Sequence, residues 1–423
     1  MSSDTPSGLA DVIEGVDEPG LVDALRRLIA VPSMGGTPAE AEVQGLLAAA
    51  WAADGLAVET WDLDIPALMS TPGYPGMEVE RTSALGVVAR WPGTGDGPTL
   101  LLLGHTDVVP PGDLEAWSGD PFDPRIAGDR ILGRGSCDMK AGVAAMWFAV
   151  RALRDAGIRL RGDIVLAAVS GEEDGGLGTF GLLQRGITAD ACIVPEPTDL
   201  DLVPANGGAL TFRLRVRGRA THASRRTEGV SAIEKFVPVL EALRQLEERR
   251  NAVVDPLMSR WPIAYPLSIG IVHAGDWAST VPDLLVADGR FGVAIGETPD
   301  QARAELEACV ASASARDPWL ADHPVEVEWW GGQFASGRTD PGHDVVRRLG
   351  HARALVTGSE PEVYGGPYGS DLRLLVGGGI ATVQFGPGDS RAAHAPDEWV
   401  PIPDTITCAR TLAAFAVDYC GRA

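Results

Sequence analysis

Four apolar runs of strand length recur along this chain, and they constrain its fold more than any other feature. They are residues 98–103, 163–169, 190–195 and 380–385. Between the first two runs, Met139 to Ala156 has the length of a helix, and Gly157 follows at a position suited to its C-terminal cap. Strands that are apolar throughout must be covered on both faces, and helices between strands indicate parallel pairing. The sequence therefore predicts an α/β fold with a mostly parallel central sheet.

The pattern changes between about residues 209 and 325, where apolar and polar side chains begin to alternate. Residues 210–217 read as a strand with one solvated face. Further elements are expected at about 229–250 (helix), 267–272 and 284–295 (strands), 299–314 (helix) and 325–330 (strand). This β-α-β-β-α-β order is typical of a ferredoxin-like α+β unit. We therefore expect a second domain at 209–325, inserted into a first domain formed by residues 1–208 and 326–423, and a length of 423 residues fits two domains.

The charge and the cysteines limit the possible partners and compartment. The chain has 58 Asp and Glu against 35 Lys and Arg, a formal net charge of −23. Such a surface repels phosphate backbones and anionic lipids, so we expect neither a nucleic-acid nor a membrane partner. Five cysteines without a C-x-x-C pair, together with a polar, acidic N-terminus unlike a signal peptide, predict a cytoplasmic protein with reduced thiols.

Each apolar run is followed directly by side chains that bind metals. The residues concerned are His105 and Asp107 after the first run, Glu172 and Glu173 after the second, Glu196 after the third, His394 after the fourth, and Asp138 at the start of the intervening helix. Ligands of open α/β sheets bind beyond the carboxyl ends of the strands. Imidazoles and carboxylates together suit zinc, manganese or cobalt.

Each of these segments has a simpler interpretation when it is taken alone. A single histidine after a strand is more often a hydrogen-bonded structural residue, and Glu-Glu-Asp is usually a solvated loop. Cys137, beside Asp138, is better explained as a small buried residue than as a reactive thiol. Five such segments at successive strand ends of one predicted sheet are not readily produced by chance, so we favour the metal site.

The same segments carry a family resemblance. GHTDVVP, GRGSCDMKAG, SGEEDGGLGT, IVPEPTD, THAS and AHAPDEWVPI resemble, in order, the motifs of the M20 metallopeptidases. The nearest subgroup is that of acetylornithine deacetylase and succinyl-diaminopimelate desuccinylase. The resemblance runs from about residue 20 to the C-terminus. It implies a zinc-peptidase-type catalytic domain, with the inserted domain serving as a lid and for dimerisation.

The resemblance also implies a ligand set for two zinc ions, for which cobalt or manganese could substitute. His105 would bind one ion and His394 the other, with Asp138 bridging them. Glu173 and Glu196 would complete the two coordination shells. Such pairs of metals activate water for attack on an amide carbonyl.

Two acidic residues beside the ligands have implied roles in catalysis. Glu172 would be the general base, which takes a proton from the attacking water and returns it to the leaving nitrogen. Asp107 would orient the His105 imidazole by accepting its second N–H. The implied activity is hydrolysis of an amide bond in a small substrate that carries a carboxylate.

Further residues are assigned from the resemblance to substrate binding. His222 matches the oxyanion histidine, which in relatives comes from the partner subunit of a homodimer; alone, THAS could be a strand-end turn. Arg290 matches the lid arginine that holds a substrate carboxylate, although an exposed strand-edge charge is the simpler interpretation. Gly386 and Gly388 would present backbone N–H groups to the same carboxylate. Ser279 stands where many relatives have an asparagine that takes part in closing over the substrate. The sequence does not decide whether Ser279 takes over this role.

Three functions remain open from the sequence. The leading one is removal of a formyl, acetyl, succinyl or similar group from an amino acid or related small amine. The second is a di- or tripeptidase or carboxypeptidase with the same machinery. The third, a non-catalytic binding scaffold, is disfavoured because all the expected ligands and the base are present. The Pro- and Gly-rich stretch 65–77 reads as a loop to which the sequence assigns no function.

Overall fold

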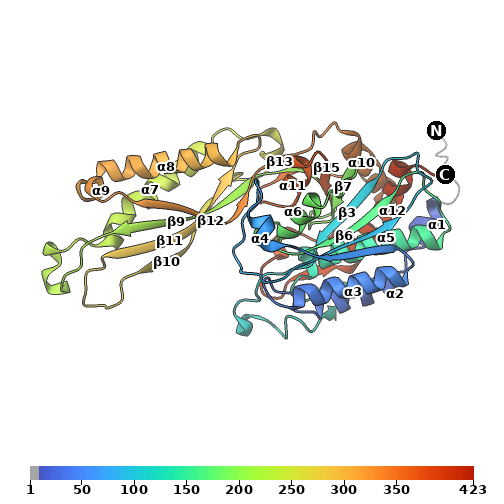
Figure 1. Ribbon diagram of the computed structural model, residues 1–423, viewed down its shortest axis with the longest axis horizontal. Coiled ribbons are helices and arrows are strands. Elements are labelled where there is room, and N and C mark those ends of the chain that lie inside the picture. The colour runs from blue at the N-terminus through green and yellow to red at the C-terminus, as the bar shows by residue number, and fades with distance from the viewer. Residues whose placement is uncertain (1–8) are drawn as a thin grey trace.

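A computed structural model describes residues 9–423 as a layered α/β domain from which a smaller, narrower domain extends (Figure 1). The larger domain is built on a nine-stranded sheet whose central pairs, β6–β3, β3–β7 and β7–β15, are parallel. Its outer pairs include antiparallel ones, such as β1–β2 and β2–β6. The predicted α/β class with a mostly parallel sheet is confirmed.

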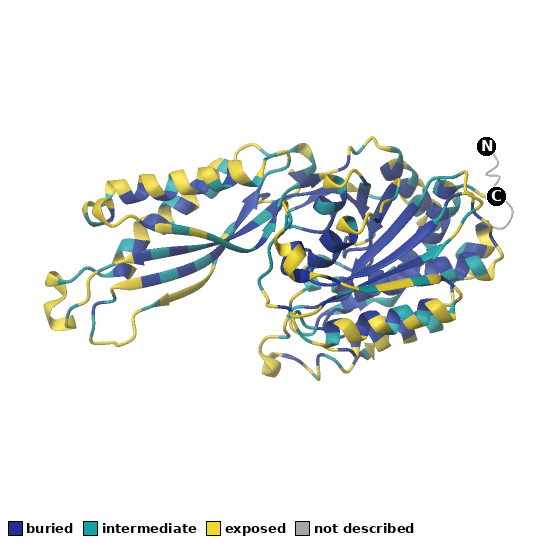
Figure 2. Cartoon of the chain, viewed as in Figure 1, coloured by how far each residue is buried: buried dark blue, intermediate teal, exposed yellow. Residues whose placement is uncertain are grey.

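The four apolar runs form four neighbouring strands at the centre of this sheet. Every residue of β3 and β6 is buried, as expected for strands covered on both faces (Figure 2). In sheet order, the strands are β1 (Ala57–Asp62), β2 (Leu85–Trp91), β6 (Ile164–Val169), β3 (Leu100–His105), β7 (Ala191–Val194), β15 (Ala381–Gln384), β8 (Leu202–Asn206) and β13 (Gly337–Arg338), with β14 (Val363–Gly366) also paired to β8.

Helices cover this sheet, and the helix expected after the first apolar run is α5. Twelve of its fifteen residues are buried, because it packs against β3 and β6 on one side and against α2 and α12 on others. The helices of this domain are α1 (Leu9–Glu14), α2 (Glu18–Ile29), α3 (Ala39–Ala53), α4 (Ile65–Met69), α5 (Ala141–Asp155), α6 (Leu177–Gln184), α10 (Asp344–Thr357), α11 (Leu372–Gly377) and α12 (Ile402–Cys420).

The inserted domain is a four-stranded antiparallel sheet with two long helices, and it has a core of its own. Its strands alternate between buried and more exposed residues, as the sequence pattern of 210–217 predicts (Figure 2). Its elements are β9 (Gly208–Arg217), α7 (Ala232–Arg250), β10 (Leu267–Ala274), β11 (Leu284–Val293), α8 (Pro299–Arg316), α9 (Pro318–Asp322) and β12 (Glu326–Phe334).

Two boundaries differ from the sequence-based expectation. The last strand, β12, pairs with β9, so we place the end of the inserted domain at Phe334 rather than at 325. The stretch 65–77 is not loop throughout, because α4 occupies its first five residues, capped by the Asp64 carboxylate, which accepts the Ala67 N–H at 3.1 Å. A third, small sheet consists of β4 (Arg125–Ala127), β5 (Arg130–Leu132) and β16 (Trp399–Pro401). Within residues 9–423, every helix is too short or too polar to cross a membrane.

Candidate active site

Neighbouring strand ends bring the predicted metal ligands together. His105 is the last residue of β3 and lies opposite Val169, the last residue of β6. Glu172 and Glu173 follow in the turn after β6, and Glu196 follows β7, which flanks β3 on its other side. Parallel strands end at the same edge of a sheet, so the local sequence of each strand fixes where its metal-binding side chains lie.

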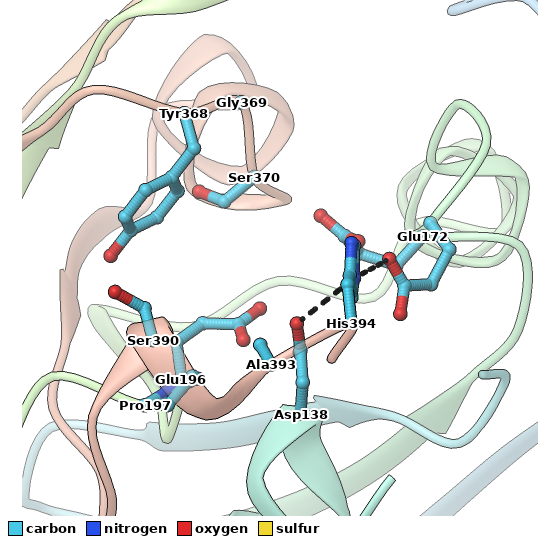
Figure 3. Close-up of a pocket in the computed structure, with 11 residues that line it drawn as sticks. Asp138, Glu172, Glu196, Pro197, Tyr368, Gly369, Ser370, Ser390, Ala393 and His394 are labelled. Atoms are coloured by element: carbon cyan, nitrogen blue, oxygen red, sulfur yellow. Dashed lines mark hydrogen bonds and ion pairs between the residues drawn. The ribbon is translucent and has the colours of Figure 1, made fainter. Parts of the chain in front are cut away.

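Asp138 lies between the two histidines and presents one carboxylate oxygen to each. Its Oδ1 is 3.0 Å from Nε2 of His105. Its Oδ2 is 3.4 Å from Nε2 of His394, a contact drawn in Figure 3. His394 Nε2 also lies 3.1 Å from Oε2 of Glu173, and His105 Nε2 lies 3.9 Å from Oε2 of Glu196. Ligand atoms of His105, Asp138 and Glu173 all lie within 4.8 Å of one another. The five predicted ligands therefore lie together in one cluster, and three of them could hold a metal ion.

The electrostatics of this cluster fit bound cations. The pKa values of Glu173 and Glu196 are raised, chiefly because burial penalises their charged forms and because other carboxylates lie nearby. The pKa of His394 is raised to about 11, mainly by its hydrogen bonds with Asp138 and Glu173. Four carboxylates, of which those of Glu172 and Glu196 are buried and those of Asp138 and Glu173 are partly buried, thus face only two imidazoles. Two divalent cations would offset this excess of negative charge, so the donor set fits a pair of metals.

Asp107 is correctly placed in the site, but the role of its carboxylate differs from the expected one. Nδ1 of His105 lies 3.0 Å from the backbone carbonyl oxygen of Asp107 and 3.8 Å from its Oδ1. The carboxylate instead accepts the backbone N–H groups of Glu172, at 3.3 Å, and Glu173, at 3.2 Å. The main chain of Asp107 therefore orients the imidazole, while its side chain fixes the turn that carries the two glutamates.

Glu398 is a buried residue of this site that the sequence analysis did not single out. Its carboxylate accepts the backbone N–H groups of Gly135, Cys137 and Asp138 at 2.9, 2.8 and 3.0 Å. It also pairs with Arg134 at 2.7 Å, and both side chains are almost fully buried. Glu398 therefore holds the segment that presents Asp138. Its position within the AHAPDEWVPI motif is the signal that could have identified it.

The metal cluster opens into a cleft between the two domains. Two adjoining pockets share Glu172, Glu173, Tyr368, Gly369 and His394. Figure 3 shows Tyr368 and Ser370 across the pocket from the carboxylates of Asp138 and Glu196. Tyr368 was also missed by the sequence analysis, although it lies in the Gly- and aromatic-rich segment YGGPYGSD. On the side of the inserted domain the cleft is lined by Gly208, Ala209, Pro266, Arg290, Gly292 and Phe334, and Pro367 of the larger domain adjoins them.

Arg290 lines the cleft as expected, but its guanidinium already has a carboxylate partner. Nη2 of Arg290 lies 3.0 Å from Oε1 of Glu78, a residue just beyond the stretch 65–77. From the sequence, we expected the Arg290 guanidinium to be available to a substrate carboxylate. Glu78 comes from a segment far away in the sequence, and no local pattern marks it.

The two glycines predicted to bind a substrate carboxylate have other partners. The N–H of Gly386 donates to the Thr198 hydroxyl at 3.1 Å, and the carbonyl oxygen of Gly388 accepts the N–H of Asp199 at 2.7 Å. Both glycines allow close packing: a Cβ on Gly386 would lie 2.3 Å from the carbonyl oxygen of Pro195. Their role in substrate binding stays a prediction, and in this structure neither glycine faces the cleft.

His222 and Ser279 lie outside the cleft of their own chain. β9 starts beside the cleft at Gly208 and runs away from it for ten residues, about 30 Å at the usual rise of a strand. His222 follows its far end, exposed, with Nδ1 2.8 Å from the Ser224 hydroxyl. The carbonyl oxygen of Ser279 accepts the N–H of Ala223 at 2.8 Å. These two residues could reach an active site only in another subunit or after a large rearrangement.

Comparisons with known proteins agree on family and fold. The model of peptidase family M20/M25/M40 matches residues 101–418. The chain is 30% identical to the N-formyl-4-amino-5-aminomethyl-2-methylpyrimidine deformylase of Bacillus subtilis (strain 168), over 87% of each chain. It is 33% identical to the succinyl-diaminopimelate desuccinylase of Leptothrix cholodnii, over 86% of this chain and 89% of that one. Among solved structures, the di-peptidase Dug1p of Saccharomyces cerevisiae has the same fold, with a TM-score of 0.78 at 17% identity over 97% and 98% of the two chains.

Proposed function

This chain belongs to peptidase family M20/M25/M40, as a metal-dependent amide hydrolase, and on that premise we propose that it is a two-zinc N-deacylase of small amines. It would remove a formyl, acetyl or succinyl group, acting in the cytoplasm as a homodimer. The observation that carries the proposal is the cluster of His105, Asp138, Glu173, Glu196 and His394, with Glu172 beside it at the end of a cleft.

Deacylation is favoured over peptide hydrolysis by the similar proteins. The deformylase and the desuccinylase, at 30% and 33% identity, both act on N-acyl groups according to their names. The peptidases among the solved structures are only 16–23% identical, and such a likeness bears on the fold alone. Di- or tripeptide hydrolysis by the same residues remains the second candidate.

The residues of the chain have separable tasks in this reaction. Bound metal ions would polarise the acyl carbonyl and lower the pKa of water. Asp138 holds the two histidines by one carboxylate oxygen each, and Glu398 holds the backbone of Asp138. Glu172 takes a proton at its carboxylate and delivers it to the leaving nitrogen. Tyr368 and Phe334 line the cleft where the amine part of the substrate would lie, and they exclude water from it.

The test of this function is a substrate panel. Metal-reconstituted protein is incubated with N-formyl, N-acetyl and N-succinyl derivatives of benzylamine and of amino acids, beside free di- and tripeptides. We expect N-acyl amines to be hydrolysed at least about tenfold faster, by kcat/KM, than any free peptide, a difference of about 1.4 kcal/mol in transition-state binding. A preference for free peptides would support the peptidase instead. Inertness toward the whole panel in protein that binds two metals would contradict both.

The position of His222 leads to a prediction about the homodimer. If His222 stabilises the oxyanion in the partner subunit's site, His222→Ala lowers kcat by about 10²–10³-fold. Mixed dimers of His222→Ala and Glu172→Ala chains would each contain one site with both residues intact. With random pairing, we expect about a quarter of wild-type activity to return, since half of the dimers are mixed and each has one complete site of two.

The mixing experiment has a direct control. The two variant proteins are also assayed separately, at the same total concentration, and their oligomeric state is measured by light scattering. Activity of an equal mixture no higher than the mean of the two separate activities would argue against a contribution of His222 to the partner subunit's site. A monomeric wild-type protein with full activity would rule it out.

A further inference from the structure

We propose that Glu78 is a permanent counter-ion of Arg290 and that the cleft consequently selects N-acyl amines without a carboxylate beside the scissile amide. This inference rests on the proposed deacylase function and names its class of substrate: an uncharged or cationic amine, with a flat, apolar portion next to the acylated nitrogen. It reverses the role that the sequence suggested for Arg290.

The Glu78 carboxylate occupies a complete binding site. Its Oε1 lies 3.0 Å from Nη2 of Arg290 on β11, and it accepts the Thr211 hydroxyl of β9 at 2.8 Å. The backbone N–H of Gly332 on β12 donates to the same oxygen at 3.3 Å. Three donors from three strands of the inserted domain thus converge on one oxygen. Such a set of donors is what a substrate carboxylate would need, and Glu78 already uses it.

The segment that carries Glu78 is anchored in the larger domain by a buried ionic network. Asp174 Oδ2 accepts the backbone N–H groups of Glu78 and Val79 at 3.1 and 2.8 Å. Arg81 pairs with Asp174 at 2.8 Å and with Glu40 at 3.0 Å, and its side chain is only 1% exposed. Asp174 directly follows the glutamates of the active site. Glu78 is therefore fixed relative to the catalytic residues through its main chain as well as its side chain.

Close backbone packing prevents this segment from withdrawing. The carbonyl oxygen of Pro75 accepts the N–H of Gln333 on β12 at 2.8 Å. A Cβ on Gly76, which has a φ of +83°, would lie 2.0 Å from the carbonyl oxygen of Gly331. On its other side, a Cβ on Gly175 would lie 2.1 Å from the carbonyl oxygen of Gly76. Residues 75–79 therefore fill the space between β12 and the turn that carries Glu172.

The charges that line the cleft then disfavour an anionic substrate. With Arg290 paired to Glu78, a substrate carboxylate at this end of the cleft would face the Glu78 carboxylate. It would also approach the buried carboxylates of Glu172 and Glu173. Displacing Glu78 would leave its carboxylate, 25% exposed, without its charged partner, which costs free energy.

The remaining walls suit a flat apolar group. Phe334, Pro266, Pro367 and Tyr368 line the same part of the cleft. The Arg290 guanidinium lies 5.5 Å from the centre of the Phe334 ring, and the Arg373 guanidinium lies 3.9 Å from it. Phe334 is therefore held in place by two cations and presents a rigid aromatic wall. An arylmethylamine, acylated on its nitrogen, matches both the shape and the charge of this region.

Glu78→Gln tests the inference, because it keeps the shape of the side chain and removes its charge. The probes are N-formylphenylglycine and its primary amide, N-formylphenylglycinamide, which differ in one charge and little in size. Their dissociation constants are measured by calorimetry with metal-loaded protein carrying Glu172→Gln, so that neither probe is consumed. We expect the amide to bind more tightly than the acid. Adding Glu78→Gln should shift the ratio of the two constants toward the acid by about 10- to 100-fold.

Two further variants make the result specific. Glu80→Gln removes the same charge from an exposed position two residues away and should leave the ratio unchanged. Combining Glu78→Gln with Arg290→Gln should abolish the shift, since the gain depends on the freed guanidinium. A tighter complex with the acid in the background protein, an unchanged ratio in Glu78→Gln, an equal shift in Glu80→Gln, or binding of neither probe to any variant would overturn the inference. Turnover of N-formylbenzylamine by the wild type, measured separately, tests the deacylase function itself.

Discussion

Replacing Glu172 by glutamine is expected to lower kcat by about 10²–10⁴-fold, the usual contribution of a positioned general acid–base group. Glu172 is 7% exposed, lines both parts of the cleft, and has its backbone N–H fixed by Asp107. Among residues 9–423, no side chain donates a hydrogen bond to its carboxylate. Burial raises the pKa of Glu172 well above its ordinary value. A raised pKa suits a general base, because the carboxylate must first accept a proton and later return it. Single-turnover kinetics on the best N-acyl amine would measure the loss.

The neighbouring glutamate is the matched control for this prediction. Glu173 pairs with His394 at 3.1 Å, so Glu173→Gln should reduce metal content as well as turnover. Glu172→Gln should retain the metal content of the wild type, measured by mass spectrometry of the purified protein. A Glu172→Gln variant that keeps more than about a tenth of the wild-type kcat would contradict its role as the base.

Arg81→Met should be the most destabilising single substitution outside the active site. Removing one partner of a buried ionic group leaves charges without compensation and typically costs about 3–5 kcal/mol. Here two carboxylates would be affected, because Glu40 and Asp174 both pair with Arg81 and are 5% and 8% exposed. Urea denaturation at pH 8, followed by tryptophan fluorescence, would measure the loss in free energy of unfolding.

The loss should depend on pH in a defined direction. The pKa of Glu40 is raised from 4.5 to about 7 even with Arg81 present, mainly by burial and secondly by Asp107. Without Arg81 the influences that raise this pKa remain. The folded variant then holds the Glu40 proton more tightly than the unfolded chain does. The contribution of Glu40 to the stability of the variant is therefore fully present below about pH 4.5 and is lost as the pH rises through 7 and above.

An exposed ion pair provides the control for the stability measurement. Arg27 pairs with Asp23 at 3.2 Å, but both side chains are at least 60% exposed. Arg27→Met should therefore cost no more than about 1 kcal/mol, with little change between pH 5 and 8. If Arg81→Met cost as little as this control at pH 8, the buried network would not anchor the segment that carries Glu78.

The sequence by itself predicted the sheet and the inserted domain, and it pointed to the five residues proposed as metal ligands. Each of these depends on a local signal. An apolar run predicts a buried strand, and the residues after it lie at the edge of the sheet where such folds bind ligands. The observed strands β3, β6, β7 and β15 begin and end within two residues of the expected runs. The roles of the ligands followed from the family motifs, which are local as well.

Only the tertiary structure decided which polar groups pair with one another. Arg81 and Asp174 are 93 residues apart, and Glu78 reaches Arg290 from the other domain. The carboxylate of Asp107 accepts hydrogen bonds from backbone N–H groups rather than from His105. The N–H of Gly386 donates to the Thr198 hydroxyl. A side chain's residue type gives the bonds it can make, but its partners depend on how distant segments pack. That packing follows from the burial of the whole core, so the sequence could propose metal ligands but could not identify the partner of Arg290.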